Sequence, residues 1–244
     1  MTGGAKGFPK AVLFDLDGTL VDSAPDIREA VNELLATRGL AALSVPQVTL
    51  MIGNGVEKLV ARAFAAAGAP LDQTALTGAY ADMKPIYLRH TTRLTTLLPG
   101  VREAMAALHV KGIGLCVVTN KPQVATREIL THFGLAEMLS AIVGGDAVVN
   151  KKPAPDGIYL ALDKLRVQPQ DAMMVGDSKA DVGAARAAGI PVCLVRGGYT
   201  QTPADELGAD LVLDSLQQLP LALADWAAAA SRSAASEEDV AVIV

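Results

Sequence analysis

The sequence has few cysteines and few histidines, and each shortage excludes a class of protein. Its two cysteines, Cys116 and Cys193, lie in separate apolar runs without the spacing of a disulfide framework or a metal site. Buried reduced thiols and a cytoplasmic setting are therefore expected. The three histidines, His90, His109 and His132, lie in helical-looking segments away from other motifs. This placement argues against a Ser-His-Asp hydrolase and against a histidine-ligated zinc enzyme.

Charge and hydrophobicity exclude further classes. The formal net charge is -5, and no basic stretch is dense enough for a nucleic-acid interface. Residues 1–10 contain no apolar core of a signal peptide, and no apolar run is long enough to span a bilayer. A phosphate-binding loop of the type Gly-x-x-x-x-Gly-Lys-Ser/Thr is also missing. We therefore expect no nucleic-acid partner and no membrane partner.

The second part of the chain alternates between short apolar runs and helical patterns. Short buried strands that alternate with helices indicate βαβ units and a parallel sheet, and hence an α/β fold. The predicted strands are Ala11–Phe14, Gly114–Val118, Ala141–Val143, Ala172–Val175, Val192–Val195 and Asp210–Leu213. The predicted helices are Val101–Lys111, Gln123–Phe133, Asp156–Leu165, Ala180–Ala188 and Leu216–Leu223.

Residues 23–96 show only helical patterns. Apolar residues recur at helical spacing from Ile27 to Gly39, and further helices are predicted over Pro46–Gly53, Val56–Ala67 and Thr74–Arg93. No strand is predicted between Ser23 and Leu97. We therefore divide the chain into an α/β core (1–22 and 97–226), a helical insert (23–96) and a tail (227–244) that we expect to be mobile.

Two carboxylates directly follow the first strand. Asp15 and Asp17 lie where ligands bind in an open α/β sheet, just beyond the carboxyl end of a strand. Residues i and i+2 of an extended chain project to the same side, so both carboxylates face one small volume. Two anions this close resist ionisation unless a cation lies between them. The pair predicts a hard divalent metal ion, with Mg²⁺ favoured.

Polar residues also follow later strands. Thr119 and Asn120 come after Val117-Val118, a pattern that equally fits an ordinary helix cap. Lys152 precedes Pro153 in a segment that otherwise reads as a solvated turn. Asp177 ends the strand Met173–Val175 and Asp181 follows four residues later, where it can also cap the next helix.

These motifs, in this order, resemble those of the haloacid dehalogenase-like (HAD) hydrolases, mostly phosphatases with an aspartate nucleophile. The resemblance runs from about Val12 to Leu219. It implies a Rossmann-like parallel sheet with helices on both faces and a small all-helical cap inserted after the first strand.

The resemblance also implies roles for these residues. Asp15 would attack phosphorus and form an aspartyl-phosphate, and Asp17 would act as general acid and base. Thr119 would bind a phosphoryl oxygen, with Asn120 as a further substrate contact, and Lys152 would offset negative charge. The implied metal residues are Asp15, Asp17 (through its carbonyl oxygen), Asp177 and Asp181, the last either directly or through water.

Within the family, Met51–Val56 together with the segments around Gly144-Gly145-Asp146 and Asn150–Pro153 resembles bacterial phosphoglycolate phosphatases. The expected substrate is therefore 2-phosphoglycolate, read by Asn54 and Lys58 of the cap. Gly53-Asn54-Gly55 also fits a plain helix–helix turn, and Arg62 fits an exposed surface charge.

Three alternatives remain open: a phosphatase for another sugar phosphate or for pyrophosphate, an isomerase similar to β-phosphoglucomutase, and a non-catalytic binding protein. Such mutases carry a histidine in the first insert helix, where this chain reads Asp26-Ile27-Arg28-Glu29. A homodimer is left open.

Overall fold

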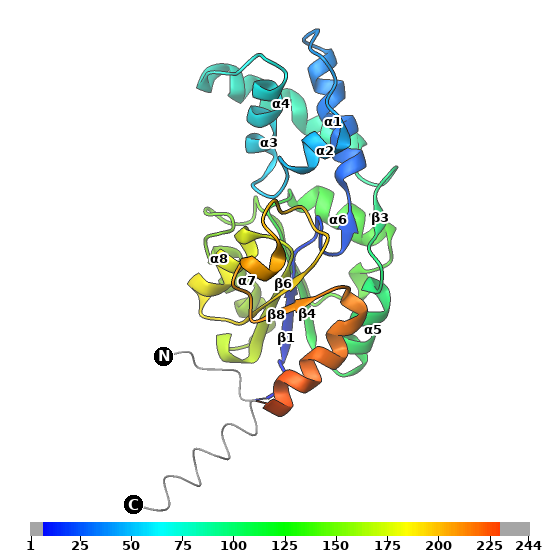
Figure 1. Cartoon of the computed structure of the whole chain (residues 1–244), viewed down its shortest axis with the longest axis vertical. Helices are drawn as coiled ribbons and strands as arrows, with labels where there is room; N and C mark the ends of the chain where they lie inside the picture. The colour runs from blue at the N-terminus through cyan, green and yellow to red at the C-terminus, as the bar shows by residue number, and fades with distance from the viewer. Residues whose placement is uncertain (1–6, 230–244) are drawn as a thin grey trace, which may run out of the picture.

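The computed structural model describes residues 7–229, and its centre is a parallel sheet (Figure 1). The strand order is β5-β4-β1-β6-β7-β8. The bounds are Ala11–Phe14 (β1), Gly114–Val118 (β4), Ala141–Val143 (β5), Ala172–Gly176 (β6), Val192–Val195 (β7) and Leu211–Leu213 (β8). Every residue of β1, β6 and β7 is buried, which requires cover on both faces of the sheet. The predicted α/β fold with a parallel sheet is confirmed.

Alternate side chains of β1 enter two separate hydrophobic cores. Val12 and Phe14 point to one core, and Ala11 and Leu13 point to the other, as the two-residue period of a strand requires. The first core is covered by α5 (Val101–Val110), α6 (Gln123–His132) and the helix of residues 219–229. The second is covered by α7 (Asp156–Leu165) and α8 (Lys179–Ala188). Helices therefore lie on both faces of the sheet.

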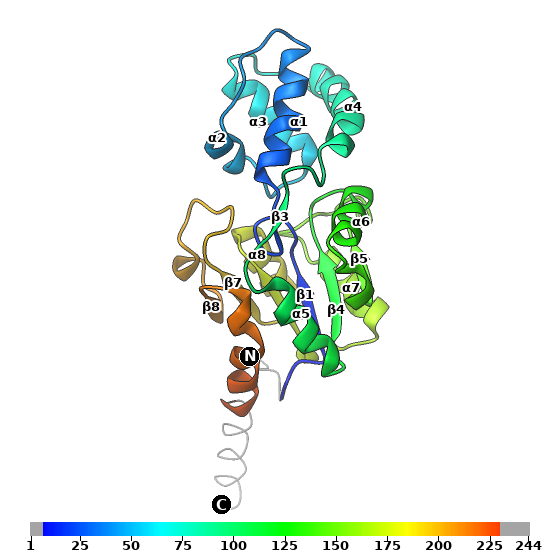
Figure 2. The ribbon, with the colours of Figure 1, turned by 90° about the vertical axis from the view of Figure 1, so that its right-hand side faces the viewer.

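Four helices between β1 and β4 form a unit with a hydrophobic core of its own. They are α1 (Ala24–Ala36), α2 (Val45–Thr49), α3 (Val56–Ala66) and α4 (Gln73–Arg89). Figures 1 and 2 show this helical unit, in blue and cyan, above the carboxyl ends of the strands. We call it the cap. The cluster also includes Ala125 of α6, so α6 contributes to the junction between cap and core.

Two cap helices are shorter than predicted. Helix α2 ends at Thr49 rather than Gly53, and a turn that contains Gly53 and Gly55 leads into α3. Both glycines have positive φ angles, 107° and 87°, which a helix does not accommodate. Helix α4 ends at Arg89 rather than Arg93, because the backbone leaves the helical conformation at His90 (φ -122°, ψ 64°).

A two-residue strand pair joins the two chain segments that connect cap and core. β2 (Val21–Asp22) pairs antiparallel with β3 (Thr96–Leu97). The prediction that no strand lies between Ser23 and Leu97 is therefore wrong at Thr96. A pairing of two residues carries no alternating pattern, so the sequence gives no signal for it.

Asp26, in the first turn of α1, holds the returning segment. Its Oδ2 accepts hydrogen bonds from the backbone N–H of Leu94 (3.0 Å) and Thr95 (2.8 Å), and from the Thr95 hydroxyl (2.8 Å). The Asp26 side chain is buried. The connection is thus fixed in part by hydrogen bonds to a buried carboxylate.

Asp26→Ala is expected to lower the free energy of unfolding by about 2–3 kcal/mol, because it leaves buried donors without their charged acceptor. The measurement is urea denaturation. Asp82→Ala, which removes an exposed ion pair with Arg38 in the same unit, serves as the control and should change little. An unchanged urea midpoint for Asp26→Ala would show that this carboxylate does not hold the connection.

The end of the described chain is more helical than predicted. A short 3₁₀ turn, η4 (Leu216–Gln218), leads into an α-helix over residues 219–229, whereas the prediction was Leu216–Leu223. Residues 227–229 of the predicted tail belong to this helix, and residues 230–244 lie outside the described residues. Shorter 3₁₀ turns are η1 (Ala136–Met138), η2 (Pro169–Asp171) and η3 (Ala204–Glu206). Among the described residues, no helix is long and apolar enough to cross a membrane.

Both cysteines are free and buried, as predicted. Cys116 lies in β4 and Cys193 in β7, where they pack as small apolar side chains. Burial raises the pKa of each thiol to about 12, so both stay protonated at neutral pH.

Candidate active site

Strands β1, β4 and β6 end side by side, and the residues after them form one site. β1 lies between β4 and β6 in the sheet, with Phe14 level with Val117 and Val175. The chain therefore brings Asp15, Thr119 and Asp177 to the same edge. Segments far apart in the sequence meet there because parallel strands run in the same direction, so that their carboxyl ends lie at one edge of the sheet.

A small pocket lies at this edge, between the core and the cap. Its core side carries Asp15, Asp17, Thr119, Asn120 and Lys121. Its cap side is mostly apolar and is lined by Ile27, Ile52, Gly53, Gly55, Val56, Leu59 and Tyr87. The pocket therefore has polar side chains on its core wall and mostly apolar side chains on its cap wall.

Asp15 lies at the base of this pocket and is 8% exposed. One of its carboxylate oxygens accepts a hydrogen bond from the Leu16 N–H (2.7 Å) and pairs with Lys152 Nζ (3.0 Å). Burial raises its pKa to about 6; Lys152 opposes this rise, and the negative charges of Asp181 and Asp17 add to it. A second positive charge near Asp15 would relieve this repulsion.

Asp15, Asp177 and Asp181 form a buried acidic cluster. One oxygen from each lies within 4.8 Å of the others. Burial raises the pKa of Asp177 well above its usual value, and the charges of Asp181 and Asp15 raise it further. Three carboxylates with only oxygen donors are the ligand type that Mg²⁺ prefers, so the residues present fit the predicted metal.

The Asp177 carboxylate is held from two sides. Its oxygens accept hydrogen bonds from the Thr19 hydroxyl (2.9 Å) and the Tyr199 backbone N–H (2.7 Å). A side chain at Gly198 would overlap Asp177, and a Cβ on Gly18 would lie 2.6 Å from its Oδ2. Glycine at these two positions therefore makes the close approach of backbone to carboxylate feasible.

Asp181 is occupied by protein donors on both oxygens. Its Oδ1 accepts from Lys152 Nζ (2.6 Å), and its Oδ2 accepts from the Ser178 hydroxyl (2.7 Å) and backbone N–H (3.0 Å). It therefore caps α8, as the alternative interpretation held, and also anchors Lys152. Of the two proposed metal roles for Asp181, this geometry favours the indirect one.

Lys152 is buried between Asp15 and Asp181. Burial alone lowers the pKa of an ammonium, but these two carboxylates raise the pKa of Lys152 above its usual value. The side chain therefore carries a positive charge beside Asp15.

Asn120 uses its side-chain amide to hold the backbone rather than to face a ligand. Its Nδ2 donates to the carbonyls of Gly53 (2.8 Å) and Lys152 (2.9 Å), and its Oδ1 accepts from the Lys152 N–H (2.9 Å). Both amide hydrogens are thus committed. Thr119 differs: within residues 7–229, its hydroxyl oxygen accepts one long hydrogen bond, from the Lys121 N–H (3.3 Å), so its hydrogen can be donated to a ligand.

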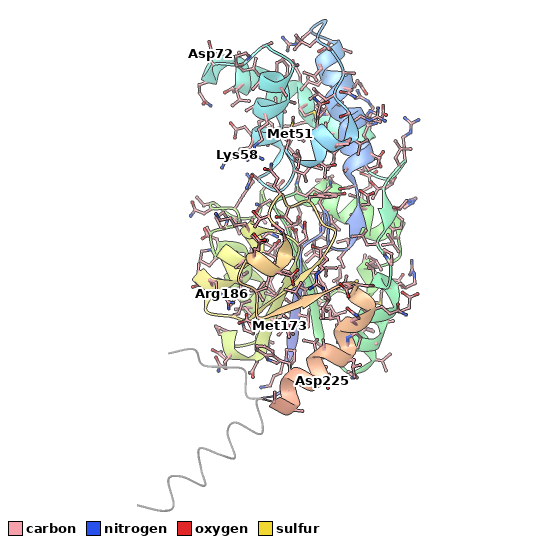
Figure 3. All side chains as sticks on the ribbon, in the orientation of Figure 1. Met51, Lys58, Asp72, Met173, Arg186 and Asp225 are labelled. Carbon is pink, nitrogen blue, oxygen red and sulfur yellow. The ribbon has the colours of Figure 1, made fainter. Side chains whose placement is uncertain are left out.

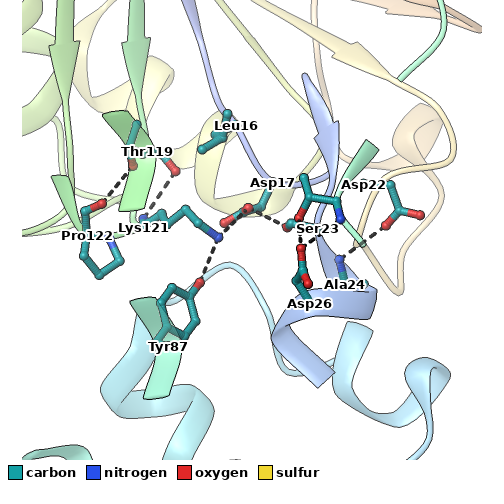
Figure 4. Close-up of polar contacts among 12 residues, drawn as sticks. Leu16, Asp17, Asp22, Ser23, Ala24, Asp26, Tyr87, Thr119, Lys121 and Pro122 are labelled. Atoms are coloured by element: carbon teal, nitrogen blue, oxygen red, sulfur yellow. Dashed lines mark hydrogen bonds and ion pairs between the residues drawn. The ribbon is translucent and has the colours of Figure 1, made fainter. Parts of the chain in front are cut away.

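Asp17 contacts residues that the sequence did not single out. Its Oδ1 accepts from the Ser23 hydroxyl (2.6 Å) and pairs with Lys121 Nζ (3.0 Å), and Lys121 also donates to the Tyr87 hydroxyl (2.8 Å). Figure 4 shows Lys121 between Asp17 of the core and Tyr87 of the cap. Because Lys121 directly follows the Thr119-Asn120 motif, its place in the site could have been predicted from the sequence. Tyr87 lies in no such motif, so the sequence gives no indication of its place in the site.

Tyr199 is a second residue without a sequence signal. Its hydroxyl accepts from the backbone N–H groups of Ser23 (2.7 Å) and Ala24 (2.9 Å) and donates to Asp22 (2.6 Å). Its own N–H binds Asp177. One residue thus joins the start of the cap to the acidic cluster.

Asn54 and Lys58 do not line the pocket that contains Asp15. Asn54 Oδ1 accepts from Arg62 (2.7 Å), which also donates to the Met51 carbonyl (2.8 Å) and so holds the turn before α3. Lys58 is exposed at the edge of the cap (Figure 3) and, with Asn54, lines a separate open hollow together with Lys151, Lys152 and Pro153 of the core. The turn faces the pocket through Ile52, Gly53 and Gly55 instead. Arg62 is exposed, as predicted, and its guanidinium also holds the turn through these two hydrogen bonds.

Comparison with known proteins agrees with this geometry. The model of the haloacid dehalogenase-like hydrolase family matches residues 12–195. The chain belongs to this family and is therefore a hydrolase.

Individual relatives carry names that are more specific than the name of the family. The chain is 46% identical over 216 residues to the "Phosphoglycolate phosphatase, plasmid" of Cupriavidus necator, covering 87% of this chain and 92% of that protein. It is 41% identical over 222 residues to the phosphoglycolate phosphatase of Rhodospirillum rubrum, covering 89% and 90%. The crystal structure of a predicted phosphoglycolate phosphatase from Haemophilus somnus 129PT superposes with a TM-score of 0.81 at 32% identity, covering 91% and 98%.

Proposed function

We propose that this hydrolase is a Mg²⁺-dependent phosphatase that converts 2-phosphoglycolate and water to glycolate and phosphate. The observation that carries the proposal is the buried Asp15 carboxylate, placed beside Lys152 and the acidic cluster in a small pocket under the cap. The relatives named phosphoglycolate phosphatase, at 41% and 46% identity, support the choice of substrate.

The chemistry takes two steps on Asp15. Its carboxylate oxygen forms a bond to phosphorus while the bond from phosphorus to the leaving oxygen breaks, and Asp17 gives that oxygen its proton. Asp17 then takes a proton from water, which attacks phosphorus and releases phosphate and the free Asp15. Asp17 lines the same pocket as Asp15, where it can reach the leaving oxygen.

Groups held in fixed positions offset the negative charge of the phosphoryl group during its transfer. The Lys152 ammonium lies 3.0 Å from Asp15, and the Thr119 hydroxyl has a hydrogen to donate. Asp15 and Asp177 would hold the metal ion, with Asp181 orienting Lys152 at its side. When bound, Mg²⁺ supplies positive charge that offsets the negative charge on the phosphoryl oxygens.

The cap wall of the pocket favours a small leaving group. Ile27, Ile52, Val56 and Leu59 present no side-chain hydrogen-bonding groups for the hydroxyls of a sugar. A sugar phosphate would leave those hydroxyls desolvated and unpaired, which costs free energy. A two-carbon ester avoids this cost.

The proposal is tested by measuring phosphate release with Mg²⁺ from 2-phosphoglycolate, ethyl phosphate, phenyl phosphate, glucose 6-phosphate and pyrophosphate. We expect kcat/KM to be highest for 2-phosphoglycolate, by about tenfold or more over ethyl phosphate, since one charged hydrogen bond is worth this much. A higher value for the sugar phosphate or for pyrophosphate would assign the enzyme to that substrate instead. Conversion of β-glucose 1-phosphate to glucose 6-phosphate would make it an isomerase.

We further propose a cytoplasmic enzyme of carbohydrate metabolism that binds neither nucleic acid nor membranes and is compatible with a homodimer. The two buried, unpaired thiols support a reducing compartment.

A further inference from the structure

Lys121 is a buried cation that the two-step chemistry leaves without a role. It is 4% exposed and lines the pocket under the cap. An ammonium group has three hydrogens to donate. Among residues 7–229, Nζ has two oxygen partners, Asp17 Oδ1 at 3.0 Å and Tyr87 Oη at 2.8 Å. The third hydrogen is available to a molecule in the pocket.

The charges around the pocket decide what that molecule can be. Its other charged lining residues are Asp15 and Asp17, both carboxylates, and its cap side is mostly apolar. A substrate carboxylate placed there would be desolvated next to like charges, which is unfavourable unless a cation pairs with it. Lys152 contacts Asp15 and Asp181 and is not among the residues that line this pocket. Lys121 is the positive group that lines the pocket.

The ammonium is fixed in place by its contacts with the Asp17 carboxylate and the Tyr87 hydroxyl. Nζ also lies 4.9 Å from the centre of the Tyr87 ring. Tyr87 belongs to α4 and Asp17 to the core, so Nζ is held from both sides of the pocket (Figure 4).

We propose that Lys121 binds the carboxylate of the substrate and thereby selects small phosphorylated carboxylates over neutral phosphate esters. This inference rests on the proposed function and moves the specificity contact from the exposed cap residue Lys58 to a buried residue of the core. The phosphate is bound by Thr119 and Lys152, and the carboxylate by Lys121, whose ammonium lies beside Asp17 and Tyr87 in the pocket.

The test compares Lys121→Met with Lys121→Gln, which keeps a donor but loses the charge. In wild type and variants, kcat/KM is measured for 2-phosphoglycolate and for ethyl phosphate, which has the same chain without the carboxylate. Both variants are expected to lower the ratio of the two values by about ten- to a hundred-fold, the effect of one charged hydrogen bond. Thermal unfolding checks that each variant is folded.

A binding measurement separates substrate recognition from the contact with Asp17. In an Asp15→Asn background, calorimetry with 2-phosphoglycolate and with inorganic phosphate reports affinity without turnover. Lys121→Gln should lower the affinity for 2-phosphoglycolate by about ten- to a hundred-fold and leave the affinity for inorganic phosphate nearly unchanged. If Lys121 only positions Asp17, both substrates lose kcat equally and neither affinity changes, which overturns the proposal.

Two further lysine variants complete the design. Lys111→Met removes a lysine on the far side of the core, over the Phe8 ring, and should alter neither ratio nor affinity. Lys58→Met tests the residue predicted from the sequence to bind the carboxylate. If Lys58→Met lowers the kcat/KM ratio and Lys121→Gln does not, the carboxylate is bound by the cap residue Lys58 and not by Lys121. A wild-type enzyme without preference for 2-phosphoglycolate would instead contradict the proposed function itself, and the carboxylate contact with it.

Discussion

Asp15→Asn is expected to lower kcat by at least about a thousandfold, the scale seen when a nucleophile is removed. The amide that replaces the carboxylate cannot form the aspartyl-phosphate, and no neighbouring group is placed to take over. Asp17 is held by Ser23 and Lys121, and Asp181 by Ser178 and Lys152. The measurement is steady-state phosphate release from 2-phosphoglycolate and from phenyl phosphate.

The fold should survive this substitution. Asp15 lies among like charges, and the amide removes one of them while Lys152 keeps its 2.6 Å contact with Asp181. The thermal midpoint should therefore stay at or above the wild-type value. Asp171→Asn, which loses an exposed ion pair with Lys10, is the matched control and should keep full activity. If Asp15→Asn keeps more than about a tenth of the wild-type rate, the assignment of the nucleophile is wrong.

Removal of divalent metal with EDTA is the second change with a large expected effect: activity should vanish and return with Mg²⁺. Asp15 and Asp177 both have raised pKa values because their charges are buried together, and a bound cation offsets this repulsion. Mg²⁺ requires near-octahedral geometry at short distances, whereas Ca²⁺ takes more and longer oxygen contacts. Ca²⁺ should therefore restore little activity.

A readout besides activity is the thermal midpoint of the metal-free protein. It should rise when Mg²⁺ is added, because a ligand that binds the folded state stabilises it, and sodium chloride at equal ionic strength should not reproduce the rise. Asp177→Asn should abolish most of the rise. Full activity in metal-free buffer would refute the metal-dependent proposal.

The location of the acidic and polar groups on the core could be predicted from the sequence. Short apolar runs such as Ala11–Phe14 and Gly114–Val118 have few alternatives to buried strands in a chain of this composition. Parallel strands end at a common edge, so residues that directly follow them converge. Asp15, Thr119 and Asp177 are brought together for that reason, so their proximity could be predicted without knowledge of any individual side-chain contact.

The cap could be predicted as a helical unit but not in its orientation. Helical periodicity identifies the apolar face of each helix, and the residues of α1, α3 and α4 do form one cluster. It does not say which turn faces the core. Asn54 and Lys58 looked suitable for a carboxylate by residue type, yet Arg62 binds Asn54, and the exposed Lys58 lines a different hollow from the one that contains Asp15.

Contacts between distant segments were decided by the tertiary structure alone. The Lys121 contact with Tyr87 joins the two units, and the β2–β3 pair and the Asp26 contacts with Leu94 and Thr95 fix the chain segments that connect them. Such contacts depend on how one folded unit docks on another, and no local pattern in either segment encodes that geometry. The sequence by itself therefore determined the family, the strand ends and the carboxylates that follow them. Docking of the cap decided which residues close the pocket, because that arrangement brings Tyr87 to Lys121 and places Ile52, Gly53 and Gly55 rather than Lys58 over Asp15.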